Sequence, residues 1–255
     1  TGVPPGALSG VDAVVGLGGV SIGDRRWSGG VKQQLRDSRI IPTTALAEAV
    51  AAAGVPVFVS ASATGFYGDT GSRAVDESAP RGTGFLADLT VDWEAATAPA
   101  AAARVVQLRT APVLSRSGGM LGRLRPLYRF GFGARMGSGE QYLSWISLPD
   151  AVGAISHALS RPDITGPVNL AAPDAVPFAE FHRAYSQLRH RPSFLRVPGA
   201  VARAVGGEMV EEMILASSRV VPTVLSTTGF TFAHPTLTDA LTYTERETAG
   251  VSTRG

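Results

Sequence analysis

Three short runs of apolar, largely β-branched residues recur in the first half of the chain, separated by stretches with helical periodicity. The runs cover Asp12–Leu17, Val55–Ser60 and Arg104–Arg109. Helical patterns lie between them, over residues 30–53 and Leu86–Ala102. Strands that alternate with helices at this spacing are typical of crossover units, which build a parallel sheet. The sequence therefore predicts an α/β protein with a doubly wound, Rossmann-like parallel sheet.

The pattern changes after Ser115. Residues 115–140 hold many glycines and arginines without a clear period, and short strands and helices then follow in mixed order. We predict a Rossmann-like core, the later part of a dinucleotide-binding fold, over residues 1–115. A smaller, substrate-side α+β lobe is predicted over residues 116–255. A small-molecule substrate is expected where the loops that follow the strands meet that lobe.

Composition narrows the possible functions. The 255 residues are 44% hydrophobic and 17% charged, as in a globular protein, and 23 basic residues nearly balance 21 acidic ones. The arginines are scattered, so no nucleic-acid partner is predicted. The absence of cysteine excludes thiolate chemistry, and the four histidines are not spaced as metal ligands, so no metal is expected. His182 and His190 are expected at the surface. No apolar run approaches the roughly 20 residues of a membrane span, which predicts a cytoplasmic protein without membrane contact.

A glycine cluster, Gly16-Leu17-Gly18-Gly19, follows the first apolar run. The dinucleotide fingerprint requires G-x-G-x-x-G after a strand and at the start of a helix. Gly16 and Gly18 fit this pattern, but Ser21 occupies the third position and no helix follows at once. From the residues alone, we interpret the cluster as a strand-to-loop turn at which small residues allow close approach to the backbone.

Several longer motifs extend along the chain, among them DAVVGLGG followed by RRW, then SASATGFYGD, WEAA, LRTAPVLSRSGGML, GSGEQYLSWI and GFTFAHPTL. Together they resemble the atypical extended short-chain dehydrogenases, in particular their epimerase family 39U-like subgroup, related to nucleoside-diphosphate-sugar epimerases. The resemblance covers nearly the whole chain, including the C-terminal domain of that family. It implies an oxidoreductase or epimerase-like enzyme that uses NADP or NAD, and it places the glycine cluster at a turn along the cofactor.

Members of this family begin with a strand, a glycine-rich turn and a helix that seat the nucleotide. No such segment precedes Thr1 in this sequence. We therefore expect an N-terminally truncated sheet whose strand at Asp12–Leu17 exposes an apolar edge. A second copy of the chain in a homodimer could cover that edge.

The resemblance also implies a set of binding residues. Those on the cofactor side are Gly16, Leu17, Gly18, Gly19, Ser60, Ala61, Thr110, Pro112 and Val113. Arg39 could bind a phosphate bidentately, or it could be a solvated charge on a helix. Gln141 and Trp145 resemble the substrate-pocket wall, although core packing is the alternative for Trp145. Arg123 lies in a loop where an anionic substrate could enter.

Short-chain dehydrogenases use a Tyr, a Lys four residues later, and a Ser. Counting back from Glu94, the Tyr and Lys positions hold Leu86 and Thr90, which cannot exchange protons. Ser62 is the candidate to contact a substrate hydroxyl, with a serine bonded to its own turn as the alternative. Tyr67 could add a phenol to the same pocket, although a structural tyrosine is favoured. The resemblance thus implies an NAD(P)-dependent enzyme without the Tyr-x-x-x-Lys pair. The alternative is a cofactor-independent enzyme (elimination or cyclisation) or a non-catalytic binding protein on the same scaffold.

Overall fold

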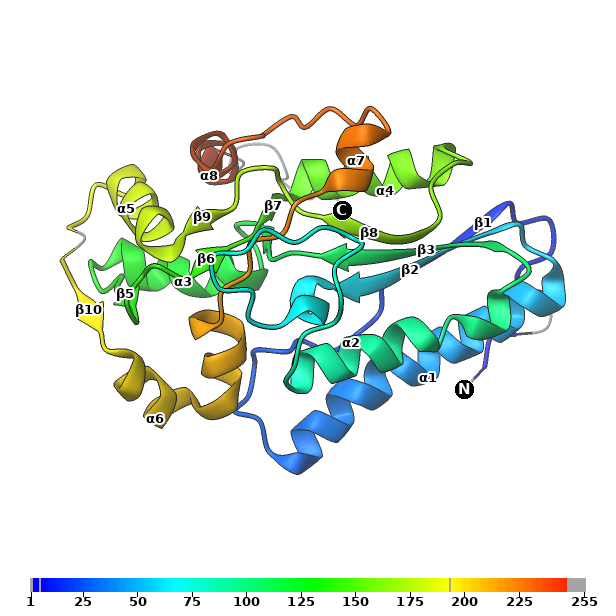
Figure 1. The fold of residues 1–255 in the computed structure, drawn as a ribbon, viewed down its shortest axis with the longest axis horizontal. Coiled ribbons are helices and arrows are strands. Elements are labelled where there is room, and N and C mark those ends of the chain that lie inside the picture. Colours follow the sequence, from blue (N-terminus) through cyan, green and yellow to red (C-terminus); the bar gives the residue numbers. More distant parts are fainter. Residues whose placement is uncertain (1, 5, 193, 247–255) are drawn as a thin grey trace, which may run out of the picture.

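The computed structural model describes residues 2–4, 6–192 and 194–246, and a four-stranded parallel sheet lies at its centre (Figure 1). The strands are β1 (Ala13–Gly16), β2 (Val57–Ala63), β3 (Arg104–Thr110) and β8 (Gly166–Leu170), in the order β1-β2-β3-β8. The first three correspond to the three apolar runs. The predicted α/β class with a Rossmann-like parallel sheet is confirmed.

Helices cover both faces of this sheet. In Figure 1, α1 (Gly29–Ala53) and α2 (Phe85–Ala95) lie below it, whereas α4 (Leu148–Ser160) and α7 (Thr223–Thr227) lie above it. Successive residues of a strand point to opposite faces. Phe58 of β2 accordingly packs into the cluster that contains α1, and its neighbour Val59 packs into the cluster that contains α4.

Helix α1 owes its two ends to its sequence. The Ser28 side chain accepts a hydrogen bond from the backbone N–H of Val31 at 3.3 Å, which caps the start of the helix. Gly54, with φ of 66°, adopts the left-handed conformation that ends it. The helix runs on through Pro42. The continuous helix packs against β1, β2 and α2 on one face of the sheet.

A smaller, mixed α+β part around α3, α5 and α6 lies at the left of Figure 1 and is called the second lobe here. It is smaller than residues 116–255, because β8 joins the central sheet and α4 and α7 pack on that sheet. Its cluster of buried aromatic and aliphatic side chains includes Trp145, Phe181 and Tyr185. Besides the elements above, the chain forms short helices η1 (Thr64–Tyr67), η2 (Ala98–Ala100) and η3 (Glu211–Leu215), helices α3 (Gly119–Arg129), α5 (Phe178–Leu188), α6 (Gly199–Val210) and α8 (Leu237–Arg246), and two-residue strands β4 (Val113–Leu114), β5 (Arg135–Met136), β6 (Tyr142–Leu143), β7 (Ile146–Ser147), β9 (Val176–Pro177) and β10 (Arg196–Val197). These strands pair as β4 with β7, β5 with β10 and β6 with β9.

One histidine lies elsewhere than expected. His182 was predicted at the surface, but it is only 2% exposed. It sits on the buried face of α5, and its Nδ1 lies 2.7 Å from the Tyr128 hydroxyl. The prediction was wrong because a polar ring can be buried when a neighbouring hydroxyl satisfies its nitrogen.

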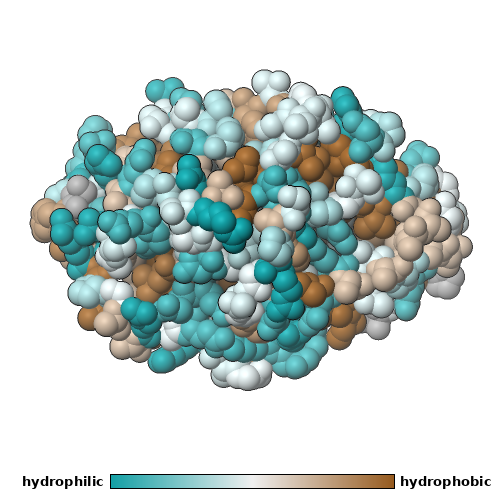
Figure 2. Space-filling view, in the orientation of Figure 1, coloured by the Kyte–Doolittle hydropathy of each residue, from teal (hydrophilic) through white to brown (hydrophobic). Residues whose placement is uncertain are grey.

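Strand β1 forms one edge of the sheet within the part of the chain that the structure describes. Val15 and Leu17 remain 39% and 58% exposed, so apolar side chains are accessible at this edge among the described residues. On the face drawn in Figure 2, hydrophobic residues otherwise alternate with hydrophilic ones. Within the described ranges, no helix has the length and apolar character needed to cross a membrane.

Candidate active site at the carboxyl edge of the sheet

The register of the sheet places Gly16 and Thr110, two of the predicted cofactor-side residues, at the carboxyl ends of β1 and β3, whereas Ser60 and Ala61 lie within β2. Gly16 pairs with Ser60 across β1 and β2, and Ala63 pairs with Thr110 across β2 and β3. All the strands are parallel, so their carboxyl ends meet at one edge. Ligands of open α/β sheets bind in the crevice outside these ends.

Arg39 of α1 binds the backbone of the turn that follows β1. A Cβ placed on Gly18 would meet no atom within 4 Å, whereas one on Gly19 would lie 3.3 Å from Cζ of Arg39. Arg39 donates through Nη2 to the carbonyl of Val20 at 3.0 Å and through Nη1 to that of Leu35 at 3.2 Å. It is 9% exposed, and burial lowers the pKa of its guanidinium. In this structure Arg39 therefore fastens the loop to α1, and the space above Gly18 stays open.

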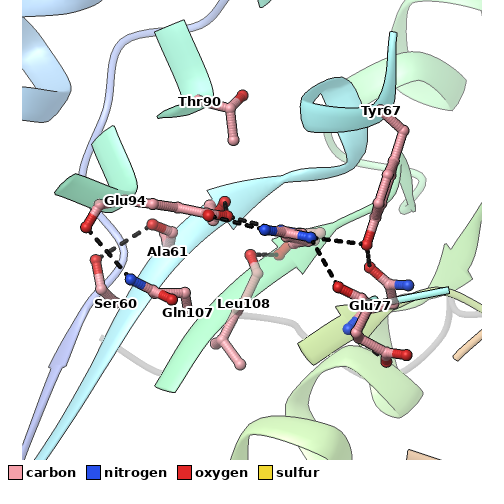
Figure 3. Close-up of polar contacts among 12 residues, drawn as sticks. Ser60, Ala61, Tyr67, Glu77, Thr90, Glu94, Gln107 and Leu108 are labelled. Carbon is pink, nitrogen blue, oxygen red and sulfur yellow. Dashed lines mark hydrogen bonds and ion pairs between the residues drawn. The ribbon is translucent and has the colours of Figure 1, made fainter. Parts of the chain in front are cut away.

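Beneath the edge, five polar side chains form one connected group, here called the Glu94–Arg109 network (Figure 3). Ser62 Oγ donates to Glu94 Oε1 at 2.6 Å. Arg109 donates to the same carboxylate twice, from Nε at 2.8 Å and from Nη2 at 2.9 Å. Its Nη1 donates to the Tyr67 hydroxyl at 3.0 Å, and that hydroxyl donates to Oδ1 of Asn169 at 2.7 Å. The network thus joins α2, β2, η1, β3 and β8.

Burial and hydrogen bonding shift the pKa values of Tyr67 and Arg109. Tyr67 is 2% and Arg109 5% exposed. Burial raises the pKa of the Tyr67 phenol, and the hydrogen bond from Arg109 offsets only part of the rise. Burial by itself would lower the pKa of Arg109, but hydrogen bonds with Glu94 and Tyr67 outweigh it and raise that pKa. The guanidinium also lies 3.4 Å from the centroid of the Phe66 ring, a cation–π contact. Arg109 is therefore a permanent buried cation, and Tyr67 a neutral phenol.

A second carboxylate extends the network toward α7. Glu77 Oε1 accepts from the backbone N–H groups of Asn169 at 3.0 Å and Val224 at 3.2 Å. Its Oε2 is buried without a hydrogen-bond partner. Glu77 thereby fixes the end of β8 against the segment that covers it.

The start of α2 carries Leu86 and Thr90, which were expected at the positions of the acid–base pair. The side chain of Leu86 is apolar, and the Thr90 hydroxyl donates to the carbonyl of Leu86 at 2.7 Å. The Glu212 carboxylate, from η3, accepts from the backbone N–H groups of Phe85 and Leu86, each at 2.8 Å. An anion is favoured at a helix N-terminus, where N–H groups lack partners. Glu212 thus anchors the second lobe to the sheet domain at the edge of the site.

The predicted substrate-side residues are engaged within the protein. Trp145 is fully buried and donates from Nε1 to the carbonyl of Asp174 at 2.7 Å. Gln141 donates from Nε2 to two backbone carbonyls, at 3.0 and 3.2 Å. Arg123 forms an ion pair with Asp24 and donates to the Ser21 hydroxyl at 3.0 Å. Trp145 is a core residue in this structure, and Gln141 joins β5 to η3. Arg123 was predicted in a loop, but it lies on α3 and ties that helix to the loop that follows β1.

Two hollows border the loop that follows β1. One, of about 200 Å³, lies between this loop and α1 and is lined by Val20, Asp24 and Leu35 among others. The other, of about 380 Å³, lies between Arg26 and α6. Ser62 and Tyr67 line neither of them. Among the described residues, no group of three or more His, Cys, Asp or Glu side chains could hold a metal ion.

Sequence reasoning assigned no role to the members of the network that carry its charge. Glu94 and Arg109 stand in the motifs WEAA and LRTAPVL, and Asn169 in GPVNL. The available signal was an arginine near the end of a predicted buried strand, because a cation in a buried strand requires a carboxylate nearby. Such a rule does not identify the partner, which lies 15 residues away on another element.

Comparison with known proteins decides the family. Residues 6–171 match the NAD dependent epimerase/dehydratase family, and residues 197–244 match a domain of unknown function, DUF1731. The chain belongs to the NAD dependent epimerase/dehydratase family. An epimerase family protein of Mycobacterium bovis is 53% identical over 241 residues, which are 94% of this chain and 80% of the relative. The family resemblance inferred from the motifs is confirmed.

Solved structures agree with this assignment. The crystal structure of the human epimerase family protein SDR39U1 with NADPH has a TM-score of 0.89 at 31% identity, covering 96% of this chain and 84% of that one. A nucleoside-diphosphate sugar epimerase from Corynebacterium glutamicum has a TM-score of 0.74 at 32% identity, covering 93% of this chain and 48% of that one.

Proposed function

We propose that this family member binds a nicotinamide dinucleotide, NADP(H) or NAD(H), along the carboxyl edge of its sheet. It would act on a small-molecule substrate as an oxidoreductase or epimerase-like enzyme. The observation that carries the proposal is the likeness, over 96% of this chain, to a human relative solved with NADPH.

The residues at the edge fit such a cofactor. The space above Gly18 is open within 4 Å of a built Cβ, so a flat ring or a phosphate can approach the backbone there. The main chain at Gly16–Gly19, Ser60–Ala61 and Thr110–Val113 would hold the cofactor from three adjacent strand ends. When bound, the nicotinamide supplies a hydride acceptor or donor. Residues 1–115 would then carry most of the cofactor contacts, and residues 116–255 would shape the substrate side.

Proton transfer would proceed without a Tyr-x-x-x-Lys pair, because Leu86 and Thr90 occupy those positions. Ser62 and Tyr67 would orient the site through their hydroxyl groups. Both are nearly inaccessible, and each donates its proton inside the Glu94–Arg109 network. The same observation favours a second candidate function, namely cofactor binding without hydride transfer on a scaffold that has lost its chemistry.

Calorimetric titration with NADPH, and then with NADH, tests the binding half of the proposal. The wild-type chain is expected to bind one of them with micromolar affinity. Gly18→Val should weaken binding at least tenfold, because its side chain enters the open space without meeting a protein atom within 4 Å at Cβ. Gly30→Ala is the matched control, since its Cβ also meets no atom but lies on α1.

The outcomes separate the candidate functions. If the folded wild-type chain binds neither cofactor, or if Gly18→Val binds as tightly as wild type, the cofactor proposal fails. If binding occurs, the nicotinamide absorbance is followed with a panel of carbonyl and nucleotide-sugar substrates. Turnover supports the oxidoreductase or epimerase-like function, and binding without turnover on any of them favours the second candidate.

A further inference from the structure

The hollow beside α6 is apolar except for one cation. Its volume is about 380 Å³, within the range of roughly 300–1,000 Å³ typical of small-molecule pockets. Met136 and Val197 form part of its wall, and Val201, Ala202 and Val205 of α6 form another part. Val201 and Val205 are 51% and 75% exposed, and Figure 2 shows brown and tan residues over α6 at the lower left. Apolar side chains are thus left accessible around this hollow.

The cation is Arg26, from the loop that follows β1. It is exposed, and no hydrogen bond or ion pair is formed by it among the described residues. The nearby carboxylates are already engaged. Glu208 pairs with Lys32 at 2.5 Å and Glu211 with Arg203 at 3.3 Å.

The third carboxylate of this segment, Glu212, is held by the first N–H groups of α2. Each acidic group of α6 and η3 therefore has its own partner, and the positive charge of Arg26 faces the pocket uncompensated. A guanidinium presents paired N–H donors that match a carboxylate.

The backbone is shaped to keep this pocket. A Cβ on Gly206 would lie 1.9 Å from Cγ2 of Val210, so the wall tolerates no side chain at that position. Gly207 has a φ of 62° and kinks α6, and a Cβ there would lie 3.2 Å from Nε of Arg26. The two glycines thus let α6 bend around the arginine.

From these features we propose that the hollow is a binding site for an amphipathic monocarboxylate. Its carboxylate would pair with Arg26, and its aliphatic body would lie against the valines and Ala202 of α6. A single cation calls for a single negative charge, and an apolar wall calls for a ligand body without polar groups. This site is separate from the proposed cofactor edge and does not depend on it.

Sodium octanoate is the probe, titrated into the full chain by calorimetry. Octanol carries the same body without the charge, and acetate carries the charge without the body. Octanoate should bind more tightly than either. Arg26→Gln should weaken octanoate binding roughly fivefold, as expected for an exposed ion pair, and leave octanol binding unchanged. Arg25→Gln is the matched control, because that adjacent exposed arginine lines the other hollow.

A second variant, Ala202→Phe, fills the pocket and should abolish binding of both octanoate and octanol. NADPH is titrated into each variant, so that a failure of the cofactor proposal is seen independently. The proposal is overturned if wild type does not bind octanoate at millimolar concentration. It is equally overturned if Arg25→Gln weakens octanoate binding as much as Arg26→Gln does, or if folded Ala202→Phe binds octanoate like wild type.

Discussion

Replacing Arg109 by methionine tests whether the Glu94–Arg109 network holds the sheet domain together. The substitution keeps much of the apolar stem but removes two hydrogen bonds to Glu94 and one to Tyr67. It also leaves a carboxylate whose side chain is only 12% exposed without its counter-charge. Removing one partner of a buried ion pair costs about 3–5 kcal/mol. We expect a loss of that size in the free energy of unfolding.

Urea unfolding followed by circular dichroism measures this loss, together with Glu94→Gln and the double variant. The two changes should be strongly non-additive, because each already removes the interaction that the other would remove. Arg161→Met is the control, since the Arg161–Asp163 ion pair lies at the surface with side chains 43% and 52% exposed, and its unfolding midpoint should not move. A loss below about 1 kcal/mol for Arg109→Met, or simple additivity in the double variant, would refute the reasoning.

Three further changes probe other parts of the fold. Glu212→Gln should lower the free energy of unfolding by about 1 kcal/mol, because it removes a negative charge from the start of α2; unchanged urea midpoints would contradict this. Burial raises the pKa of Tyr128 above its unfolded value near 10. The neutral phenol therefore contributes fully to the free energy of unfolding below pH 10, and this contribution falls by about 1.4 kcal/mol per pH unit as the pH rises further. Tyr128→Phe should therefore reduce the fall in the free energy of unfolding between pH 10 and 11. An unchanged dependence on pH would show that Tyr128 does not cause this fall. Gly206→Ala should destabilise by about 1–3 kcal/mol through its clash with Val210, whereas Gly30→Ala should not, as thermal unfolding of the two variants will show.

The first three strands could be predicted because each contains consecutive apolar residues. Such stretches are typical of strands buried on both faces, and they occur at Ala13–Val15, Val57–Val59 and Val105–Val106. The pairing of the fourth strand, β8, with β3 was not predicted, because the two strands lie some 60 residues apart in the sequence. Periodicity shows which faces are buried, but it does not show which strands pair.

The candidate site was less accessible to prediction, for a different physical reason. Family motifs locate the strand ends, and the register pairs Gly16 with Ser60 and Ala63 with Thr110. Where a hydroxyl points depends on its partner across the fold. Ser62 points toward α2 because the carboxylate of Glu94, which is paired with Arg109, accepts a hydrogen bond from its hydroxyl group there. Neither motif nor propensity encodes that contact.

The loop that follows β1 receives support from both lobes at once. Arg39 of α1 holds its beginning, and Arg123 of α3 pairs with Asp24 in its middle. The Trp27 ring near its end lies 5.0 Å from that of Phe85 at the start of α2, edge to face. The open turn at Gly18 precedes the supports at Val20 and Asp24, and Arg26 follows them, directly before Trp27. Because rigid anchors lie between the two, a ligand at either place can bind without unfolding the loop. The cofactor edge and the α6 pocket can therefore be tested one at a time.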